Sequence, residues 1–534
     1  MVETVTRIVA SVVCALVFCF MTAKTVGAMQ QSGYKNGVFL RWFKRKDNLF
    51  FNRLSVLALC LALSTAVTAL CFSFLGKTGA LVVSALPFFA LLVAFLFSDN
   101  KYALKVPAKR TGRYRRLFAA YLLFTACFCY AFIALLSFLS AWNGSKLYAL
   151  IAYVPFALTP VCLPALLCAA NAVTGVFENA RNKKFVKRAG QVLDERKILR
   201  VGVVGSYGKT SVKNILAAIL SEKYAVSATP ESYNTPIGIA KTVFDGTNAE
   251  AQVFIAEMGA RKAGDISELC RLVKPDYAVF TGVCEQHITS FGSLENVWKE
   301  KSEILRCGAK KVVCGAGLKD RLESEFSGDE SVLIADNAAI EGLELSATET
   351  RFTLRLKGGN VKAETKLLGK AAAENILLAA ALACEMGMTC EEIERGIAKI
   401  QPVPHRLQLL ESGGAYILDD GYNCNIVGAE EALAALGRFG GGKCIVTPGI
   451  VECGVLEEEI NGKLGEKIAA AGLDKVVLVG DTLVGAVKRG YLAAGGEESK
   501  LAAAKTLDEA KTLLADWIKK GDAVLFLNDL PDVY

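Results

Sequence analysis

The sequence predicts a bundle of transmembrane helices followed by α/β domains built on parallel sheets. Three observations carry this prediction. Apolar residues are concentrated in the first 175 of the 534 residues. Shortly after them, an apolar strand runs into a glycine-rich turn and then into a helical pattern. From there to the end, short β-rich apolar runs alternate with helical patterns, which is typical of a parallel sheet flanked by helices.

Five apolar runs in the first part are each long enough to cross a hydrocarbon core of ~30 Å. They cover residues 7–28, 54–75, 78–98, 117–142 and 147–175. The loops after the first and third runs, and the stretch after residue 176, are rich in Lys and Arg, whereas the alternate loops hold only Lys77 and Lys146. Because basic loops stay in the cytoplasm, we expect a multi-pass cell-membrane protein with its N-terminus outside and its long C-terminal part in the cytoplasm.

Charge and composition argue against several functions. No Asp or Glu lies within the five runs, which disfavours proton- or ion-coupled transport. The net charge of +8 lies largely in the short loops, which favours membrane topology over nucleic-acid binding. The seventeen cysteines are scattered without a C-x-x-C motif, which indicates free thiols. Only two histidines occur, His287 and His405, which argues against a zinc site.

The last apolar run leaves two interpretations of the membrane domain open. It contains Pro155, Pro160 and Pro164, which predict a kinked helix, and a kinked helix often borders a groove. The five helices therefore form either a simple anchor or a binding site for a lipid-linked substrate. In both cases the lipid bilayer is a partner, and nucleic acid is not.

The stretch that organises the rest of the chain is residues 201–213, which read VGVVGSYGKTSVK. A strand, a glycine-rich loop and a helix in this order bind nucleotide phosphates through backbone N–H groups. The Lys209 ammonium would reach the terminal phosphates, and the Thr210 hydroxyl would hold Mg²⁺. The strict pattern has a glycine where Val203 stands, so this loop is a variant. The predicted nucleotide-binding residues here are Gly205, Ser206, Tyr207, Gly208, Lys209, Thr210 and Ser211.

Two further apolar runs place polar side chains beside this loop. Residues 253–257 read VFIAE, and a carboxylate such as Glu257 at a strand end next to a phosphate-binding loop is the usual second anchor for Mg²⁺. Residues 277–283 predict another strand, and His287 follows at the carboxyl edge of the sheet, where ligands bind in open α/β folds. Lys301 comes next, in the helical stretch 297–305.

With these residues in place, residues 200–534 resemble the Mur ligase family, which joins a carboxylate to an amine with ATP. The motifs follow one order: GSYGKTSVK (205–213), SYNTPIG (232–238), EMGA (257–260), QHITSFGS (286–293), KSEI (301–304), PHRL (404–407), DDGYNCN (419–425), TPGIVE (447–452) and NDLPD (528–532). They are most similar to the members that add D-alanyl-D-alanine to a muramoyl peptide in peptidoglycan synthesis. The resemblance implies a central ATP-binding P-loop domain over 200–405 and a Rossmann-like C-terminal domain over 406–534. A basic linker, 176–199, would join them to the membrane domain, 1–175.

The resemblance also implies roles for single residues. The family's carboxylate substrate becomes an acyl phosphate, and the amine then displaces phosphate. The residues matched to catalysis are Lys209, His287, Lys301 and Arg406; those matched to Mg²⁺ are Thr210, Glu257, His287 and a carbamylated Lys301. Asn234 and Thr235 match the segment that faces the acyl substrate. Asn375, Arg406 and Asp420 match residues around ATP.

The sequence departs from the family pattern in three places. Membrane spans stand where the family has the domain that grips the UDP part of its substrate, so the acceptor is UDP-linked or lipid-linked. The adenine-side motif reads GKAAAEN over 369–375, with alanines at 371–373. An isoleucine, Ile426, follows Asn425 where the family has proline. Two alternatives therefore stay open: a related ligase for another envelope acid such as poly-γ-glutamate, and a nucleotide-binding scaffold with weak catalysis.

Overall fold

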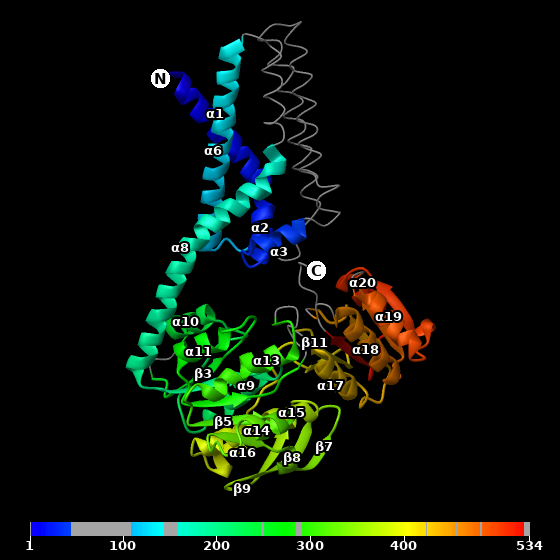
Figure 1. The fold of residues 1–534 in the computed structure, drawn as a ribbon. Coiled ribbons are helices and arrows are strands. Elements are labelled where there is room, and N and C mark those ends of the chain that lie inside the picture. Colours follow the sequence, from blue (N-terminus) through cyan, green and yellow to red (C-terminus); the bar gives the residue numbers. More distant parts are fainter. Residues whose placement is uncertain are drawn as a thin grey trace. The chain divides into compact units, whose positions relative to one another are not determined.

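The structure is a computed structural model that describes residues 2–43, 108–143, 159–246, 250–284, 291–422, 424–451, 453, 456–480 and 483–527. The chain divides into two compact units, of which the first ends at Asn182 and the second runs from Lys183 to Leu530 (Figure 1). The predicted spans 54–75 and 78–98, the beginning of span 147–175, and His287 lie outside the described residues.

The described part of unit 1 consists of helices and short connecting segments. Its helices are α1 (Val2–Met21), α2 (Ala23–Gln31), α3 (Asn36–Phe43), α6 (Gly112–Asn143) and the first part of α8 (Thr159–Arg196). A core that includes Phe18, Phe39, Leu117, Tyr121 and Leu167 holds them together. The buried Tyr121 hydroxyl lies 2.9 Å from the Thr22 hydroxyl, so this polar group is satisfied inside the core.

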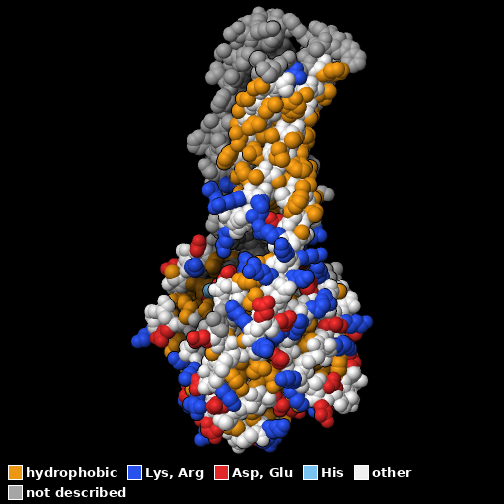
Figure 2. All heavy atoms as spheres, turned by 90° about the vertical axis from the view of Figure 1, so that its left-hand side faces the viewer, with side chains coloured by type: hydrophobic (Ala, Val, Ile, Leu, Met, Phe, Trp, Pro, Cys, Tyr) orange, Lys and Arg blue, Asp and Glu red, His pale blue; other side chains and the backbone are white. Residues whose placement is uncertain are grey.

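Many large apolar side chains of unit 1 face outward. Leu123, Leu135, Phe138 and Phe177 are all exposed, and Figure 2 shows apolar side chains covering the described helices, with Lys and Arg gathered towards one end. Among the described residues, two helices are long and apolar enough to cross a membrane, within α6 and within α8. A third span results if α1 and α2, which bend by 54° at their junction, are taken together.

The predicted last span and the predicted linker form a single helix. α8 continues without a break from Thr159 to Arg196, across residue 175. The physical reason is that no proline follows Pro164 in this stretch, and the basic residues after 180 are good helix formers. Three residues after the end of α8, the first strand begins.

Unit 2 begins with a six-stranded parallel sheet in the order β2-β3-β1-β4-β5-β6. The strands are β1 (Leu199–Val204), β2 (Val226–Ala228), β3 (Val253–Glu257), β4 (Tyr277–Phe280), β5 (Lys311–Gly315) and β6 (Val332–Ala335). The predicted strands in this region are therefore present. β3 is buried along its whole length, as expected for a central strand covered on both faces.

Alternate residues of these strands enter two different cores. Val253 and Ile255 pack with α9 (Lys209–Leu220), α15 (Lys370–Glu385) and α16 (Cys390–Ala398). Phe254 and Ala256 pack on the other face with the end of α8 and with further helices. These are α10 (Pro236–Asp245), α11 (Asp265–Val273), α13 (Leu294–Lys301), which continues as the 3₁₀ turn Ser302–Arg306, and α14 (Lys319–Glu325). This alternation follows from the two-residue period of a strand.

A three-stranded antiparallel sheet completes the central domain, and it is not among the sequence predictions. Its strands are β7 (Ile340–Leu345), β8 (Thr350–Leu356) and β9 (Gly359–Thr365). Phe352, Leu354, Val361 and Ala363 bury one face against α15 and α16, whereas the residues between them are polar. The strict polar–apolar alternation of RFTLRL, residues 351–356, is the signal that identifies β8.

The C-terminal domain is a second six-stranded sheet, in the order β10-β11-β15-β12-β13-β14. The strands are β10 (Gln408–Ser412), β11 (Ala415–Asp420), β12 (Lys443–Thr447), β13 (Lys475–Val479), β14 (Leu501–Ala504) and β15 (Ala523–Leu527). Only the edge pair β10–β11 is antiparallel. The helices are α17 (Ile426–Leu436), α18 (Glu457–Ala470), α19 (Val484–Ala493) and α20 (Leu507–Ala515).

Candidate functional site

The glycine-rich loop lies at the carboxyl edge of the central sheet, between β1 and α9. Gly208 precedes α9 with φ 72°, in the left-handed region that favours glycine. A Cβ at Gly205 would lie 1.9 Å from Thr281 Oγ1, and a Cβ at Gly208 would lie 2.8 Å from Asn375 Oδ1. A side chain at Gly205 would therefore displace Thr281 after β4, and a side chain at Gly208 would displace the amide group of Asn375. The glycines allow β4 and α15 to approach the loop closely.

Two lysines donate hydrogen bonds to the same carbonyl group of this loop. The Nζ–O distances to the Gly205 carbonyl are 2.8 Å for Lys209 and 3.0 Å for Lys301. Burial lowers the pKa of both lysines, and the charge of Lys209 helps lower the pKa of Lys301 to about 7. Lys209 is half-buried and Lys301 is buried. An ammonium group at this loop suits a bound anion such as a polyphosphate.

The first residues of the loop and of α9 supply further polar groups. Ser206 is buried, and its hydroxyl has no hydrogen-bond partner within the described structure. Its N–H donates to the Gly282 carbonyl at 2.8 Å, and Thr281 Oγ1 donates to the Tyr207 carbonyl, so the end of β4 holds the loop in place. Ser211 is half-buried in the first turn of α9.

Glu257 is the centre of a buried hydrogen-bond network next to the loop. Its side chain is 1% exposed. Thr210 Oγ1 donates to Glu257 Oε2 at 2.9 Å, Lys213 Nζ forms an ion pair with the same oxygen at 3.3 Å, and Asn234 Nδ2 donates to Oε1 at 3.0 Å. The expected neighbours Thr210 and Glu257 are thus together, because β1 and β3 are adjacent parallel strands that end at the same edge.

This network fits a magnesium ion. A hydroxyl and a carboxylate oxygen side by side at a phosphate-binding loop are the ligand types that Mg²⁺ takes together with substrate phosphates. In the part of the chain that the structure describes, no group of three or more His, Cys, Asp and Glu could hold a metal by protein ligands alone. Lys301 is here a hydrogen-bond donor, so its predicted role at a metal requires the carbamate. His287, the other predicted ligand, is not in the described part.

The segment predicted to face the acyl substrate adjoins this network. Thr235 begins α10 as its N-cap, where its hydroxyl accepts the Gly238 N–H at 3.2 Å. The Asn234 carbonyl accepts the Gly259 N–H at 2.8 Å. Asn234 is therefore fixed at both its backbone and its side chain, and it stands between Glu257 and the start of α10.

The C-terminal domain brings its predicted residues close to the loop. The Arg406 guanidinium lies 4.7 Å from the centroid of the Tyr422 ring, and its positive charge helps lower the pKa of Lys209. Asp420 Oδ1 accepts the Leu407 N–H at 3.0 Å. The Tyr422 hydroxyl lies 2.8 Å from Ser232 Oγ of the central domain, so the two domains meet here by a direct hydrogen bond.

Asp420 is expected to make stability depend on pH between about 4 and 6. Burial raises its pKa to about 6, and Asp419 adds to the shift, against the Leu407 N–H and Arg406. The folded form then binds the proton more tightly than the unfolded form, so stability falls as pH rises through this window. We expect Asp420→Asn to be increasingly stabilising relative to wild type from pH 4 to 6.5, by about 1–3 kcal/mol, in thermal unfolding. A constant difference across this range would contradict the assignment.

Sequence reasoning assigned no role to Lys213, Ser232 or Tyr422, although all three lie in the quoted motifs. Lys213 was detectable, since it follows Thr210 by three residues on a helix and must share its face. The contact between Ser232 and Tyr422 joins residues 190 positions apart. No local pattern reports such a pair.

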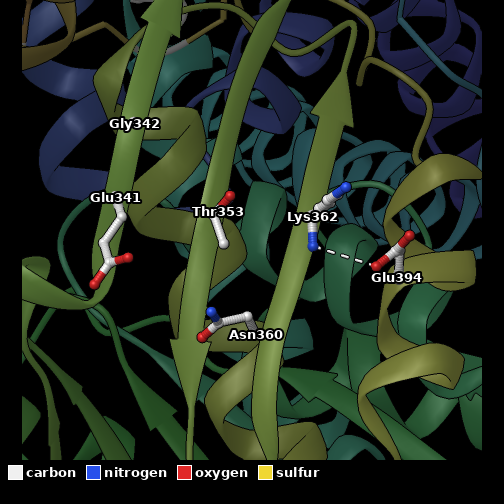
Figure 3. Close-up of a pocket in the computed structure, with 6 residues that line it drawn as sticks. All are labelled: Glu341, Gly342, Thr353, Asn360, Lys362 and Glu394. Atoms are coloured by element: carbon white, nitrogen blue, oxygen red, sulfur yellow. Dashed lines mark hydrogen bonds between the residues drawn. The ribbon is translucent and has the colours of Figure 1, made fainter.

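Two pockets are present in the described part of unit 2. One, of about 680 Å³, lies on the outer face of the small antiparallel sheet and is lined by Glu341, Gly342, Thr353, Asn360, Lys362 and Glu394 (Figure 3). Its side chains mix both charges, and no predicted site residue lines it. The other, of about 200 Å³, lies between the central and C-terminal domains and is mostly apolar. Its lining includes Cys284, Leu294, Cys424, Asn425, Ile426 and Ile450.

Known proteins resemble this chain in sequence. The Mur ligase middle domain matches residues 203–383. The UDP-N-acetylmuramoyl-tripeptide–D-alanyl-D-alanine ligase of Escherichia coli (strain K12) is 32% identical over 295 residues, which make up 52% of this chain and 64% of that protein. The ligase of the same name from Bacillus subtilis (strain 168) is 28% identical, over 52% of this chain and 62% of that protein. The chain thus spans just under two thirds of the length of these relatives.

Solved structures share the fold. MurF from Acinetobacter baumannii superposes with a TM-score of 0.60 at 22% identity, over 66% of this chain and 78% of that one. MurF from Thermotoga maritima in complex with ADP gives a TM-score of 0.58 at 24% identity, over 66% of this chain and 81% of that one. The parallel sheet and the further sheets of unit 2 are therefore arranged as in these proteins.

Proposed function

Because this chain belongs to the Mur ligase family, we propose that it is an ATP-dependent ligase that forms an amide bond between a carboxylate and an amine. The observation that carries the proposal is the buried set formed by Lys209, Lys301, Thr210, Glu257 and the Gly205 carbonyl. The proposed substrates are ATP, D-alanyl-D-alanine and a muramoyl precursor that bears a tripeptide. The names of the relatives from E. coli and B. subtilis support this choice.

The proposed reaction has two steps. A carboxylate oxygen of the peptide attacks the γ-phosphorus of ATP, the bond to the bridging oxygen breaks, and ADP leaves. The amine of the dipeptide then attacks the acyl carbon, phosphate leaves, and the amine loses a proton to solvent or to phosphate. Both steps need the reacting groups held in line and their negative charge neutralised.

The residues of the site divide this work. Lys209 would neutralise the phosphates of ATP, and the N–H groups of the glycine-rich loop would bind them. Thr210 and Glu257 would hold Mg²⁺, which neutralises phosphate oxygens when bound. Asn234 and Thr235 would orient the acyl substrate. Arg406 and Asp420 would close over the nucleotide from the C-terminal domain, and the contact between Ser232 and Tyr422 would hold the domains together around it.

The apolar pocket between the domains suits the incoming amine. Its volume of about 200 Å³ and its lining by Leu294, Ile426 and Ile450 would accept small apolar side chains such as the methyl groups of D-alanyl-D-alanine. A dipeptide with charged side chains would leave those charges unpaired there, and one with bulky side chains would not fit.

Lys301 is proposed to be carbamylated. A neutral amine reacts with carbon dioxide, and the pKa of Lys301, lowered to about 7 by burial and by Lys209, leaves much of it neutral under physiological conditions. The carbamate would be an anion beside Lys209, with which Lys301 shares the Gly205 carbonyl, and its oxygens would be ligands of the type that Mg²⁺ prefers. We expect a carbamate signal in ¹³C NMR with labelled bicarbonate that grows as pH rises through about 7 and is absent in Lys301→Arg. The same signal in that variant would assign the carbamate elsewhere.

We further propose that unit 1 anchors the enzyme in the cell membrane as a multi-pass domain, with the N-terminus outside and unit 2 in the cytoplasm. Support comes from the apolar helices α6 and α8, from their exposed apolar side chains, and from the basic loops. Resistance to alkaline carbonate extraction, together with a cytoplasmic reporter fused at the C-terminus, is the expected result. Release by carbonate would overturn the anchor.

The direct test is phosphate release and product mass with purified protein in detergent, ATP and Mg²⁺. UDP-muramoyl-tripeptide and its lipid-linked equivalent are supplied in parallel, each with D-alanyl-D-alanine. Amide product that requires both substrates supports the ligase, and the preferred acceptor shows whether the membrane domain presents a lipid-linked substrate. Nucleotide binding without product from either acceptor would reject these substrates.

A further inference from the structure

We propose that Lys213 is a positioning residue that fixes the carboxylate of Glu257 and, at the same time, the loop 229–235 that faces the acyl substrate. This inference rests on the proposed function. It adds a single buried ammonium group that connects the proposed Mg²⁺ ligand with the loop that faces the acyl substrate.

The position of Lys213 permits this double role. It lies in α9 one turn after Thr210, and its side chain is 1% exposed. Its Nζ forms an ion pair with Glu257 Oε2 at 3.3 Å and donates to the main-chain carbonyl of Glu231. One partner is the proposed metal ligand at the end of β3, and the other is a backbone group in the loop after β2.

The backbone of the loop needs such a partner. Glu231 has φ 43°, in the left-handed region that residues with a Cβ rarely adopt. A residue in such a conformation stays there only when its surroundings hold it. The ammonium group of Lys213 binds the carbonyl of this same residue. We infer that this bond keeps the loop in its present path.

From Glu231 the loop leads to each substrate-facing group. The Tyr233 N–H closes a turn onto the Pro230 carbonyl, and Asn234 donates to Glu257 Oε1 at 3.0 Å. Ser232 makes the 2.8 Å contact with Tyr422 of the C-terminal domain. A shift of this loop would therefore move Asn234 and weaken the contact between domains.

The ion pair itself is needed for another reason. Glu257 and Lys213 are both almost completely buried, and a buried charge without its partner is strongly unfavourable. Burial lowers the pKa of Lys213, and the charge of Glu257 opposes the shift. Lys213 thus holds the carboxylate group of Glu257 in place before any cation binds.

The first test separates the substrates in steady-state kinetics. Lys213→Met keeps the length of the side chain and removes its charge. We expect the KM for the muramoyl tripeptide and the KM for ATP with Mg²⁺ each to rise by about tenfold or more, because both the loop and Glu257 lose their partner, and the KM for D-alanyl-D-alanine to rise by less than about threefold. Lys241→Met, an exposed lysine of α10, is the matched control and should change none of these values. Equal increases in all three KM values would overturn the positioning role.

The second test does not depend on activity. Hydrogen exchange of loop amides 231–235, measured on the full chain in detergent without ligands, should be about tenfold faster or more in Lys213→Met, since local opening becomes easier. Because this variant leaves Glu257 unpaired, Lys213→Met is repeated together with Glu257→Gln, which removes both charges. The double variant should regain thermal stability and keep the fast loop exchange.

The outcomes are distinct. Wild-type loop exchange in a stable double variant would overturn the proposal. If wild-type protein makes no amide product, the proposed function fails, and loop exchange still decides on Lys213.

Discussion

Lys209→Ala is expected to lower kcat/KM for ligation by on the order of 10³-fold or more, because phosphoryl transfer depends on cations that neutralise the phosphates. Lys209 is the lysine of the glycine-rich loop, and its Nζ lies 2.8 Å from the Gly205 carbonyl at the carboxyl edge of the sheet. Phosphate release and product mass measure the loss. A nucleotide titration should show weaker ATP binding in the same variant.

Although Lys209→Ala should lose activity, we expect it to lose no thermal stability. Burial lowers the pKa of Lys209, which means that the folded protein disfavours its charged form. Removing the ammonium group should therefore leave the melting temperature unchanged or raise it, so that lost activity does not reflect lost folding. Lys241→Ala, at an exposed position of α10, is the control. Retention of activity within about tenfold of wild type would refute the role of the loop as a catalytic phosphate site.

Glu257→Gln is expected to abolish ligation and to destabilise the protein by about 3–5 kcal/mol, since it leaves the buried Lys213 ammonium without its partner. Gln keeps the size of the side chain and can still accept from Thr210. The change therefore removes the charge and one of the two acceptor oxygens, the other of which binds Asn234 in the wild-type protein. Thermal unfolding and the ligation assay are measured on the same preparation.

Two further variants show whether the loss of stability comes from the unpaired Lys213 charge. Adding Lys213→Met to Glu257→Gln should restore most of the lost stability and none of the activity, because the uncompensated charge is gone and the carboxylate is still missing. Glu498→Gln breaks a Lys–Glu pair that is exposed, and it should cost less than about 1 kcal/mol. Activity in the double variant would show that Glu257 is structural only.

Much of the site could be predicted because its geometry follows from the fold. Val201–Val204 and Val253–Ala256 are apolar runs that identify buried parallel strands, and adjacent parallel strands end at one edge. This rule predicts that Thr210 and Glu257 lie close together, and Thr210 Oγ1 is 2.9 Å from Glu257 Oε2. The roles of Lys301, Arg406 and Asp420 came from the family resemblance, and the structure brings each of them near the loop or its neighbours.

Other features had no local signature. The small antiparallel sheet was missed although residues 351–356 alternate polar and apolar side chains, because the longer α/β alternation dominates the region. The last apolar run and the basic linker were separated by their composition. A change of composition does not by itself end a helix, because its backbone hydrogen bonds continue until a residue such as proline interrupts them. α8 therefore continues from the apolar run into the basic linker.

The sequence by itself determined the resemblance to the Mur ligase family, the phosphate-binding loop, the acid at the end of β3 and the apolar character of the first 175 residues. These features depend on residue types at short spacings, which are visible in the sequence itself. Only the tertiary structure decided that Lys213 joins Glu257 to the Glu231 carbonyl and that Tyr422 reaches Ser232. It also showed that Lys209 and Lys301 share one carbonyl. The physical reason is that burial and long-range contacts set charge and position, and both arise only when distant segments pack together.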